Sequence, residues 1–148
     1  MSKKDKFATE PYKGVRDFYP EDQAFLNYTT ATMREVVERF GYVEYHASVL
    51  EPAELYKAKG AQNEEVINEQ SYTFTDRGGR EVTLRPEMTP TTARMVAARR
   101  REMGFPLRLY SIPNVFRYER PQRGRLREHW QLNVDIFGSS SPAADAEV

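Results

Sequence analysis

The segment from Phe116 to Gly138 constrains the fold of this chain more than any other, because two strand-like runs flank a loop that is rich in arginine. Successive side chains of an extended strand point to opposite faces, so the second run has one polar face and one apolar face. The polar set is His129, Gln131, Asn133 and Asp135, and the apolar set is Trp130, Leu132, Val134 and Ile136. The pattern predicts a hairpin with one packed face and one face available for binding.

Positive charge is concentrated in this part of the chain, although the formal net charge is zero. Residues 77–127 contain thirteen arginines and four glutamates, and five of those arginines lie in the hairpin between Arg117 and Arg127. Arginine donates planar, bidentate hydrogen bonds that match phosphate geometry. We therefore predict that the hairpin arginines bind phosphate, whereas the three consecutive arginines at 99–101 form an ordinary solvated surface.

Composition excludes several classes of protein. A chain of 148 residues with 39% hydrophobic residues can bury one real core. No apolar run approaches the roughly 18 residues of a membrane helix, and the charged start MSKKDKFATE lacks the apolar region of a secretory signal, which predicts a cytoplasmic protein. The absence of cysteine excludes disulfides and Cys-based zinc sites. The glycine-rich phosphate loops of P-loop and dinucleotide-binding proteins are also missing.

The remaining pattern alternates helices and strands and predicts a mixed α+β domain, with an antiparallel sheet that carries the site and helices on its other face. Thr89 suits an N-cap, Pro90 suits the first helical turn, and Pro113 predicts an irregular strand. The expected elements are a polar arm over 1–13, a helix through Phe25 and Phe40 that ends at Gly41, a helix over 52–60 followed by an acidic segment at 64–69, a helix over 90–103, and strands over 42–49, 72–75, 81–84 and 107–119.

Glu87 and Thr89 lie where the strand over 81–84 gives way to the helix over 90–103. From the residues alone, Glu87 is as consistent with a solvated loop carboxylate as with a functional group. A threonine in the position of Thr89 is more often only a helix cap.

The hairpin FRYERPQRGRLREHWQLNVDIFG resembles motif 2 of class II aminoacyl-tRNA synthetases, and in detail that of the histidyl-tRNA synthetase family. KGVRDFYP and SYTFTDRGGREVTLRPEMT extend the resemblance from about Lys13 to Val148. It implies a class II synthetase-like catalytic core over 14–148, with an antiparallel sheet flanked by helices. The implied activity is histidine activation by ATP, with Mg²⁺ expected, and histidyl transfer to tRNA(His).

The resemblance also assigns roles to residues of the ATP site. Arg117 corresponds to the catalytic arginine that holds the α-phosphate of ATP. Glu119 corresponds to the residue that contacts the adenine amino group, and Arg125 to the loop arginine that reaches the terminal phosphates. No residue is assigned to a metal.

For histidine, the resemblance assigns Glu87, Thr89 and Gln131 to the α-amino group and Asp135 to the imidazole ring. Met88 stands where the family usually has glycine, and Asp135 replaces a more usual glutamate that is one methylene longer.

A homodimer is implied through the helix and strand between about Glu21 and Pro52, where Ser48 replaces the family's usual proline. Family members continue with a second histidine-reading segment, a motif 3 arginine and an anticodon-binding domain, none of which precedes Val148. The expectation is therefore a truncated catalytic half, without the anticodon-binding domain, that retains binding or weak activation.

Two other functions remain open from the sequence. One is a non-catalytic regulatory paralogue of the synthetase that acts as a subunit in histidine biosynthesis, against which the complete set of hairpin arginines argues. The other is a surface that binds only RNA through phosphate contacts. Asp135 on the polar strand face argues against that second alternative. No membrane or DNA partner is expected.

Overall fold

The computed structural model describes residues 9–57 and 70–148. The first residues of the predicted arm, the end of the helix predicted over 52–60 and the acidic segment at 64–69 lie outside these ranges. The helices are α1 (Pro20–Arg39), α2 (Ala53–Lys57), α4 (Thr89–Arg99) and α5 (Pro142–Glu147). The strands are β1 (Val43–Glu44), β2 (Leu50–Pro52), β3 (Tyr72–Thr75), β4 (Glu81–Leu84), β5 (Leu107–Ser111), β6 (Asn114–Phe116), β7 (Glu128–Trp130) and β8 (Asn133–Phe137).

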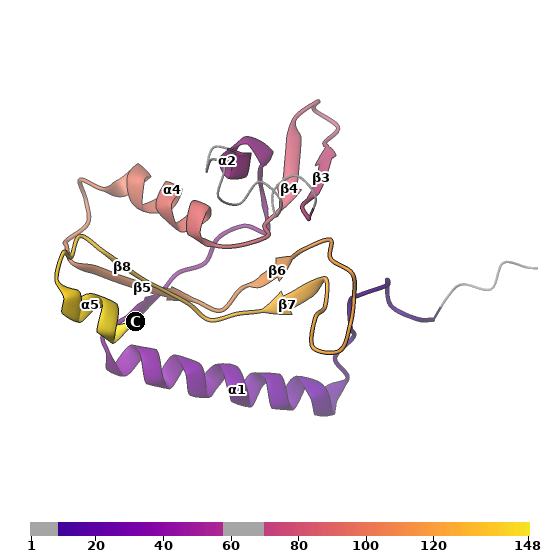
Figure 1. Cartoon of the computed structure of the whole chain (residues 1–148), viewed down its shortest axis with the longest axis horizontal. Coiled ribbons are helices and arrows are strands. Elements are labelled where there is room, and N and C mark those ends of the chain that lie inside the picture. The colour runs from indigo at the N-terminus through magenta and orange to yellow at the C-terminus, as the bar shows by residue number, and fades with distance from the viewer. Residues whose placement is uncertain (1–8, 58–69) are drawn as a thin grey trace, which may run out of the picture.

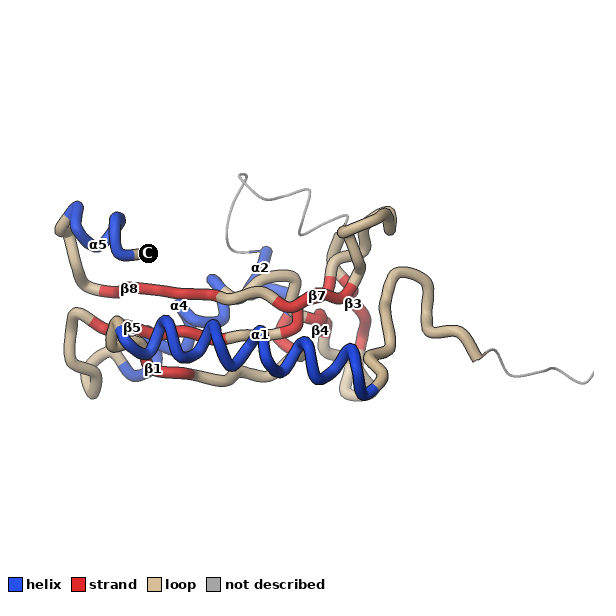
Figure 2. Tube along the Cα trace, turned by 90° about the horizontal axis from the view of Figure 1, so that it is seen from below, coloured by secondary structure: helices blue, strands red, loops and turns tan. Residues whose placement is uncertain are grey.

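These elements form a layered domain (Figure 1). Helix α1 runs along one side of β5 and β8, whereas α2 and α4 lie on the opposite side, and Figure 2 shows the same order from below. Within the described residues, the strands form three small sheets with the orders β1-β5-β8, β2-β4-β3 and β6-β7. All strand pairs are antiparallel except β1 and β5, which are parallel. The mixed α+β prediction is confirmed, with this one parallel pair as an addition.

The apolar face of β8 covers the main hydrophobic cluster. Val134 and Ile136, together with Leu132 just before the strand, pack against the buried residues Val37, Tyr42 and Tyr110. Burial of such side chains supplies roughly 1.5 to 3 kcal/mol each. The predicted alternation is therefore confirmed over Leu132–Ile136.

Trp130 does not belong to this cluster. Its side chain is 36% exposed, and its ring meets that of Phe18 edge-on at a centroid distance of 5.2 Å. The strand is interrupted between β7 and β8, so the period of two does not carry from Trp130 into β8. The prediction of one continuous apolar face was wrong at this end.

Several element boundaries differ from prediction for local reasons. The strand predicted over 42–49 shortens to Val43–Glu44 because the following carbonyls bond to Arg85, whose Nη1 donates to Ala47 O at 2.8 Å. Helix α4 starts one residue early, with Met88 in the cap position, and no side chain caps it. It ends at Arg99, before Glu102 N donates to Arg99 O in a turn.

Other predicted boundaries are confirmed. Strands β3 and β4 match the predicted ranges 72–75 and 81–84. The strand predicted over 107–119 is interrupted around Pro113, as expected, but it ends three residues early, at Phe116. Helix α1 ends just before Gly41, as predicted.

Gly14 joins the N-terminal segment to the base of the arginine hairpin. Its carbonyl accepts a hydrogen bond from Arg127 N at 2.6 Å, and its φ of +90° belongs to the region that favours glycine. A Cβ here would lie 2.7 Å from Arg127 Cδ and 2.8 Å from Pro121 Cγ. The contact therefore leaves no room for a side chain.

We expect Gly14→Ala to lower the free energy of unfolding by about 2 to 3 kcal/mol, because it combines backbone strain with overpacking. Gly124→Ala is the matched control, since Gly124 has φ +78° but no atom near its Cβ position. That control is expected to lose only about 1 kcal/mol. Urea unfolding measures both values, and equal losses would contradict the steric role of the Arg127 contact.

Candidate active site

Arg117 lies against the turn that connects β4 to α4. Its Nε donates to Pro86 O at 2.9 Å, and its backbone N donates to Arg127 O at 2.9 Å. The two terminal nitrogens of Arg117 donate to no group of the residues that the structure describes. Glu87 follows Pro86 directly, so a residue predicted for ATP and a residue predicted for histidine are neighbours in space. The guanidinium is therefore anchored through Nε, and its two terminal nitrogens remain available to a ligand.

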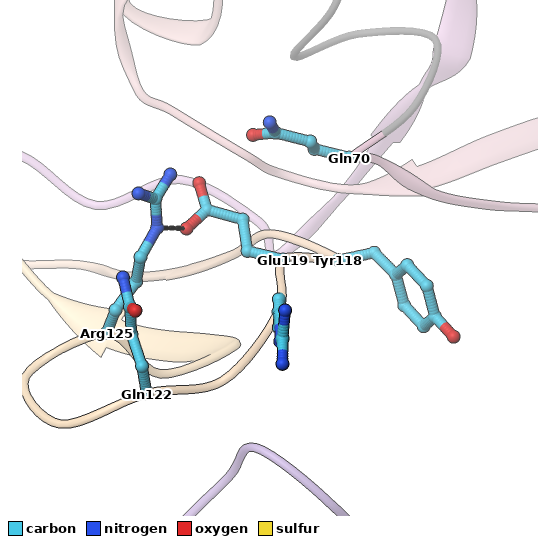
Figure 3. Close-up of a pocket in the computed structure, with 6 residues that line it drawn as sticks. Gln70, Tyr118, Glu119, Gln122 and Arg125 are labelled. Atoms are coloured by element: carbon cyan, nitrogen blue, oxygen red, sulfur yellow. Dashed lines mark hydrogen bonds and ion pairs between the residues drawn. The ribbon is translucent and has the colours of Figure 1, made fainter.

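The hairpin also forms one wall of a pocket of about 360 Å³. The residues that line it are Gln70, Tyr118, Glu119, Arg120, Gln122 and Arg125, and Figure 3 shows Glu119 and Arg125 pointing toward one another. These two side chains form an ion pair, in which Arg125 is half exposed while only 9% of the Glu119 side chain is exposed. The hydrogen bond from Arg125 is the main reason that the pKa of Glu119 lies below its usual value.

Gln70 and Tyr118 were not predicted as site residues. Tyr118 N donates to Gln70 O at 2.6 Å, which joins the segment before β3 to the start of the arginine loop. No residue pattern marks Gln70 as a partner of a segment so far along the chain. The pocket is consequently richer in neutral hydrogen-bonding groups than the sequence indicated.

Arg127 is a structural residue, and the phosphate role predicted for the hairpin arginines does not extend to it. It is 7% exposed, and its Nε donates to Glu119 O at 3.0 Å. Its Nη1 donates to Tyr12 Oη and Lys13 O, both at 3.2 Å, and its guanidinium lies 4.0 Å from the centre of the Tyr118 ring. This arginine clamps the hairpin to the N-terminal segment. The arginines at 99–101 are exposed, as predicted.

The residues predicted for histidine are not all brought together. Glu87 is half-buried in the β4–α4 connection, and Thr89 is exposed at the first position of α4. Gln131 Nε2 donates to Asn133 Oδ1 at 2.6 Å between β7 and β8. Asp135 instead lines a separate cavity of about 350 Å³ between β8 and the C-terminal segment, together with Ser139, Ala144, Asp145 and Val148.

Asp135 is the least satisfied of these residues. Its Oδ2 is buried and has no hydrogen-bond partner among the described residues, and burial raises the pKa of its carboxyl group. A buried acceptor without a donor costs about 1 to 3 kcal/mol. His129, in the same hairpin, has its pKa lowered by burial and by Arg117, so that its neutral form is favoured.

We expect Asp135→Asn to stabilise the ligand-free chain at pH 7 by about 1 to 2 kcal/mol, because it removes a poorly solvated carboxylate. Protonated Asp135 contributes stability that is fully present below the ordinary aspartate pKa of about 3.9 and is lost as pH rises through the raised folded value. The difference between variant and wild type should therefore shrink toward pH 3. Urea unfolding at both pH values measures it, with exposed Asp145→Asn as control, and a destabilised variant at pH 7 would contradict the inference.

Among the residues that the structure describes, no helix combines the length and apolarity needed to cross a membrane.

A model of the family described as histidyl-tRNA synthetase matches residues 14–148. The chain belongs to the histidyl-tRNA synthetase family. Histidine-tRNA ligase of Leptospira biflexa serovar Patoc is 54% identical over 146 residues, which are 99% of this chain and 33% of that protein. The enzyme of Thermoplasma volcanium is 50% identical over 139 residues, which are 94% of this chain and 32% of that protein.

Solved structures of histidyl-tRNA synthetases show the same fold. The ATP phosphoribosyltransferase regulatory subunit/histidyl-tRNA synthetase from Bacillus halodurans matches with a TM-score of 0.81 and 31% identity, over 100% of this chain and 37% of that chain. The apo histidyl-tRNA synthetase of S. aureus matches with a TM-score of 0.76 and 27% identity, over 95% and 32% of the two chains. The class II synthetase-like fold is thereby confirmed, and the chain spans about one third of the length of the curated relatives it matches.

Proposed function

We propose that residues 14–148 form part of the catalytic domain of a histidine-tRNA ligase, which binds ATP and histidine, forms histidyl-adenylate and passes the histidyl group to tRNA(His). The residues before this range serve as an N-terminal arm. The observation that carries the proposal is the hydrogen bond between Arg117 Nε and Pro86 O. It holds the arginine assigned to the α-phosphate beside the turn that bears Glu87, and adenylate formation requires ATP and histidine to meet at one place.

The proposed reaction is an in-line attack of the histidine carboxylate on the α-phosphorus of ATP. The new carboxyl–phosphorus bond forms as the bond to pyrophosphate breaks, and no proton transfer is needed because the carboxylate is already ionised. Negative charge that builds on the phosphoryl oxygens is stabilised by positioned cations. Arg117 meets this need, since its anchored guanidinium presents two terminal nitrogens to the ligand.

The pocket of Figure 3 suits the rest of the nucleotide. Glu119 supplies a carboxylate that accepts from the adenine amino group, and Arg125 supplies a cation for the terminal phosphates. Because these two side chains are ion-paired with each other, ATP must replace that contact with its own. Mg²⁺ would be held mainly by phosphate oxygens and would neutralise their charge. No three carboxylate or imidazole groups of the described residues converge to form a metal site of their own.

The histidine site combines an anion for the ammonium with an acceptor for the ring. Glu87 lies in the turn beside Arg117 and carries the charge that an ammonium requires, with Thr89 and Gln131 as further polar groups. The family resemblance assigns the ring N–H of histidine to Asp135, whose buried Oδ2 is an acceptor without a donor among the described residues, although it lines the separate cavity at β8. A site with such a buried acceptor rejects an analogue that lacks the matching donor far more strongly than an apolar pocket would, because the acceptor is left unpaired.

We further propose a cytoplasmic homodimer formed through residues 21–52. Exposed aromatic and aliphatic side chains follow α1 and β1 over this range, with exposed fractions of 73% for Phe25, 72% for Tyr28, 59% for Phe40 and 63% for Val43. Large exposed apolar side chains concentrated in one region of a chain are typical of a protein interface. A second copy of the chain is the occupant that the family resemblance implies.

The regulatory alternative is not favoured. The Bacillus halodurans protein is described both as a regulatory subunit and as a synthetase, so structural likeness to it does not separate the two functions. The curated relatives at 54% and 50% identity are both named as ligases. The pairing of Glu119 with Arg125 and the anchoring of Arg117 support the proposed polyphosphate site, which a regulatory subunit does not need.

Isothermal titration of the 148-residue chain with ATP and with single amino acids tests the proposal. We expect binding of ATP and of histidine, and no binding of glutamine or phenylalanine. Histidine binding without ATP binding would favour the regulatory alternative. A chain that binds neither ligand would overturn the proposed site.

A further inference from the structure

The turn that carries Glu87 is held by three successive carbonyl groups. Pro86 O accepts from Arg117 Nε at 2.9 Å, and Glu87 O accepts from the Tyr56 hydroxyl at 3.1 Å. Met88 O accepts from Thr92 N at 2.9 Å and from Thr92 Oγ1 at 3.0 Å. The donors come from the hairpin, from α2 and from α4. Glu87 therefore stands in a segment whose backbone direction is set from three sides.

Tyr56 is the residue of α2 that contacts this turn, through its hydrogen bond to Glu87 O. Its side chain is 1% exposed, and its hydroxyl also lies 3.0 Å from Thr91 Oγ1. Burial raises the pKa of Tyr56 to about 12, so the hydroxyl keeps its proton at any physiological pH and remains a donor. The protonated hydroxyl is therefore available to donate to Glu87 O.

The hydroxyl is itself held in place by a buried polar chain. Thr91 Oγ1 donates to Glu51 Oε1 at 3.1 Å, and Arg94 Nη2 donates to the same oxygen at 2.6 Å. Thr91 is fully buried, and Glu51 is 4% exposed. A buried network with satisfied partners is rigid, because every member would lose its partner if one moved. The network fixes Tyr56 between α4 and the Glu87 turn.

We propose that Tyr56 is a positioning residue for histidine: its hydroxyl, by holding the carbonyl of Glu87, directs the Glu87 carboxylate toward the substrate ammonium. The inference rests on the proposed function, since it assigns Glu87 to the ammonium. The carbonyl bond restricts rotation of the Glu87 backbone, and the side chain follows that backbone. Small displacements of a positioned group weaken its interaction with a bound substrate strongly.

Tyr56→Phe tests this inference, because it removes the hydroxyl and keeps the ring. We expect the histidine Kd to rise about fivefold to tenfold, the effect of one hydrogen bond, while the ATP Kd changes by less than about twofold. Tyr110→Phe is the matched control. Tyr110 is also fully buried, and its hydroxyl donates to Glu38 Oε1 at 2.7 Å on α1, which lies on the opposite side of β5 and β8 from α2 and α4 (Figure 1). This control should change neither constant.

A double-substitution cycle with Glu87→Gln separates positioning from general packing. If Tyr56 acts through the Glu87 carboxylate, Tyr56→Phe should weaken histidine binding no further in the Glu87→Gln chain. An additive loss, an unchanged histidine Kd, or equal losses for ATP and histidine would each overturn the positioning role. A wild-type chain that binds no histidine would instead refute the proposed function. All chains are compared in sucrose, which favours the folded state and so keeps the Phe variant measurable.

Discussion

Replacing Arg117 with alanine is expected to lower histidine-dependent exchange between pyrophosphate and ATP by about 100-fold to 1,000-fold, the usual cost of one donor to a developing oxyanion. The structure supplies two reasons for so large an effect. The variant loses the terminal nitrogens proposed to hold the α-phosphate, and it also loses the hydrogen bond from Nε to Pro86 O. The second loss loosens the turn that carries Glu87.

Arg117→Lys and Arg99→Ala serve as comparisons for that measurement. Lysine keeps the charge but not the planar fork, so it should restore little of the activity. Arg99 is an exposed residue at the end of α4, and its removal should leave exchange unchanged. Full activity of Arg117→Ala would exclude the role assigned to this residue.

Replacing Arg85 with alanine is expected to cost about 3 to 5 kcal/mol of folding free energy, the sum of roughly 1 to 3 kcal/mol for each acceptor that loses its donor and a large share of the roughly 5 to 15 kcal/mol that stabilises a typical domain. Arg85 is 2% exposed, and its Nε donates to Asn114 O at 2.9 Å. Its Nη1 donates to Ala47 O at 2.8 Å, and its Nη2 donates to Asn114 Oδ1 at 2.9 Å. Alanine would leave all three acceptors buried without a donor.

Urea unfolding measures the Arg85 effect, with Arg39→Ala as the matched arginine control. Arg39 is 72% exposed and pairs with Glu35 one helical turn away, so its loss should cost at most about 0.5 kcal/mol. A cost below about 1 kcal/mol for Arg85→Ala would contradict its place as a buried tie between β6 and the segment after β1.

The sequence predicts a structure well where the residues in contact are close together in the chain. The β3–β4 hairpin matches its predicted range because Asp76 Oδ1 accepts from Gly78 N at 2.8 Å and from Arg80 N at 3.0 Å. Arg85 and Arg127 carry no local signal that separates them from ligand-binding arginines. Their burial depends on carbonyls that only the tertiary fold brings near.

In the candidate site too, contacts within one hairpin were predicted and contacts between distant segments were not. The hairpin pattern indicated Glu119 and Arg125, and the structure pairs them directly. Gln70 and Tyr56 were not predicted as site residues, because each contacts the site through one hydrogen bond from a segment that is distant in the sequence: Gln70 O accepts from Tyr118 N, and the Tyr56 hydroxyl donates to Glu87 O. Asp135 was predicted from strand alternation on the same face as Gln131, and it lines a cavity at β8 that Gln131 does not line. Alternation assigns a side chain to a face but does not say which other segments cover it.

Histidine-dependent pyrophosphate exchange by the 148-residue chain is the most direct measurement of the proposed activity, because exchange requires ATP, histidine and a competent Arg117 together. We predict exchange with histidine and none with the other amino acids. Absence of exchange with histidine, in a chain shown by titration to bind both ATP and histidine, would contradict adenylate formation at this site.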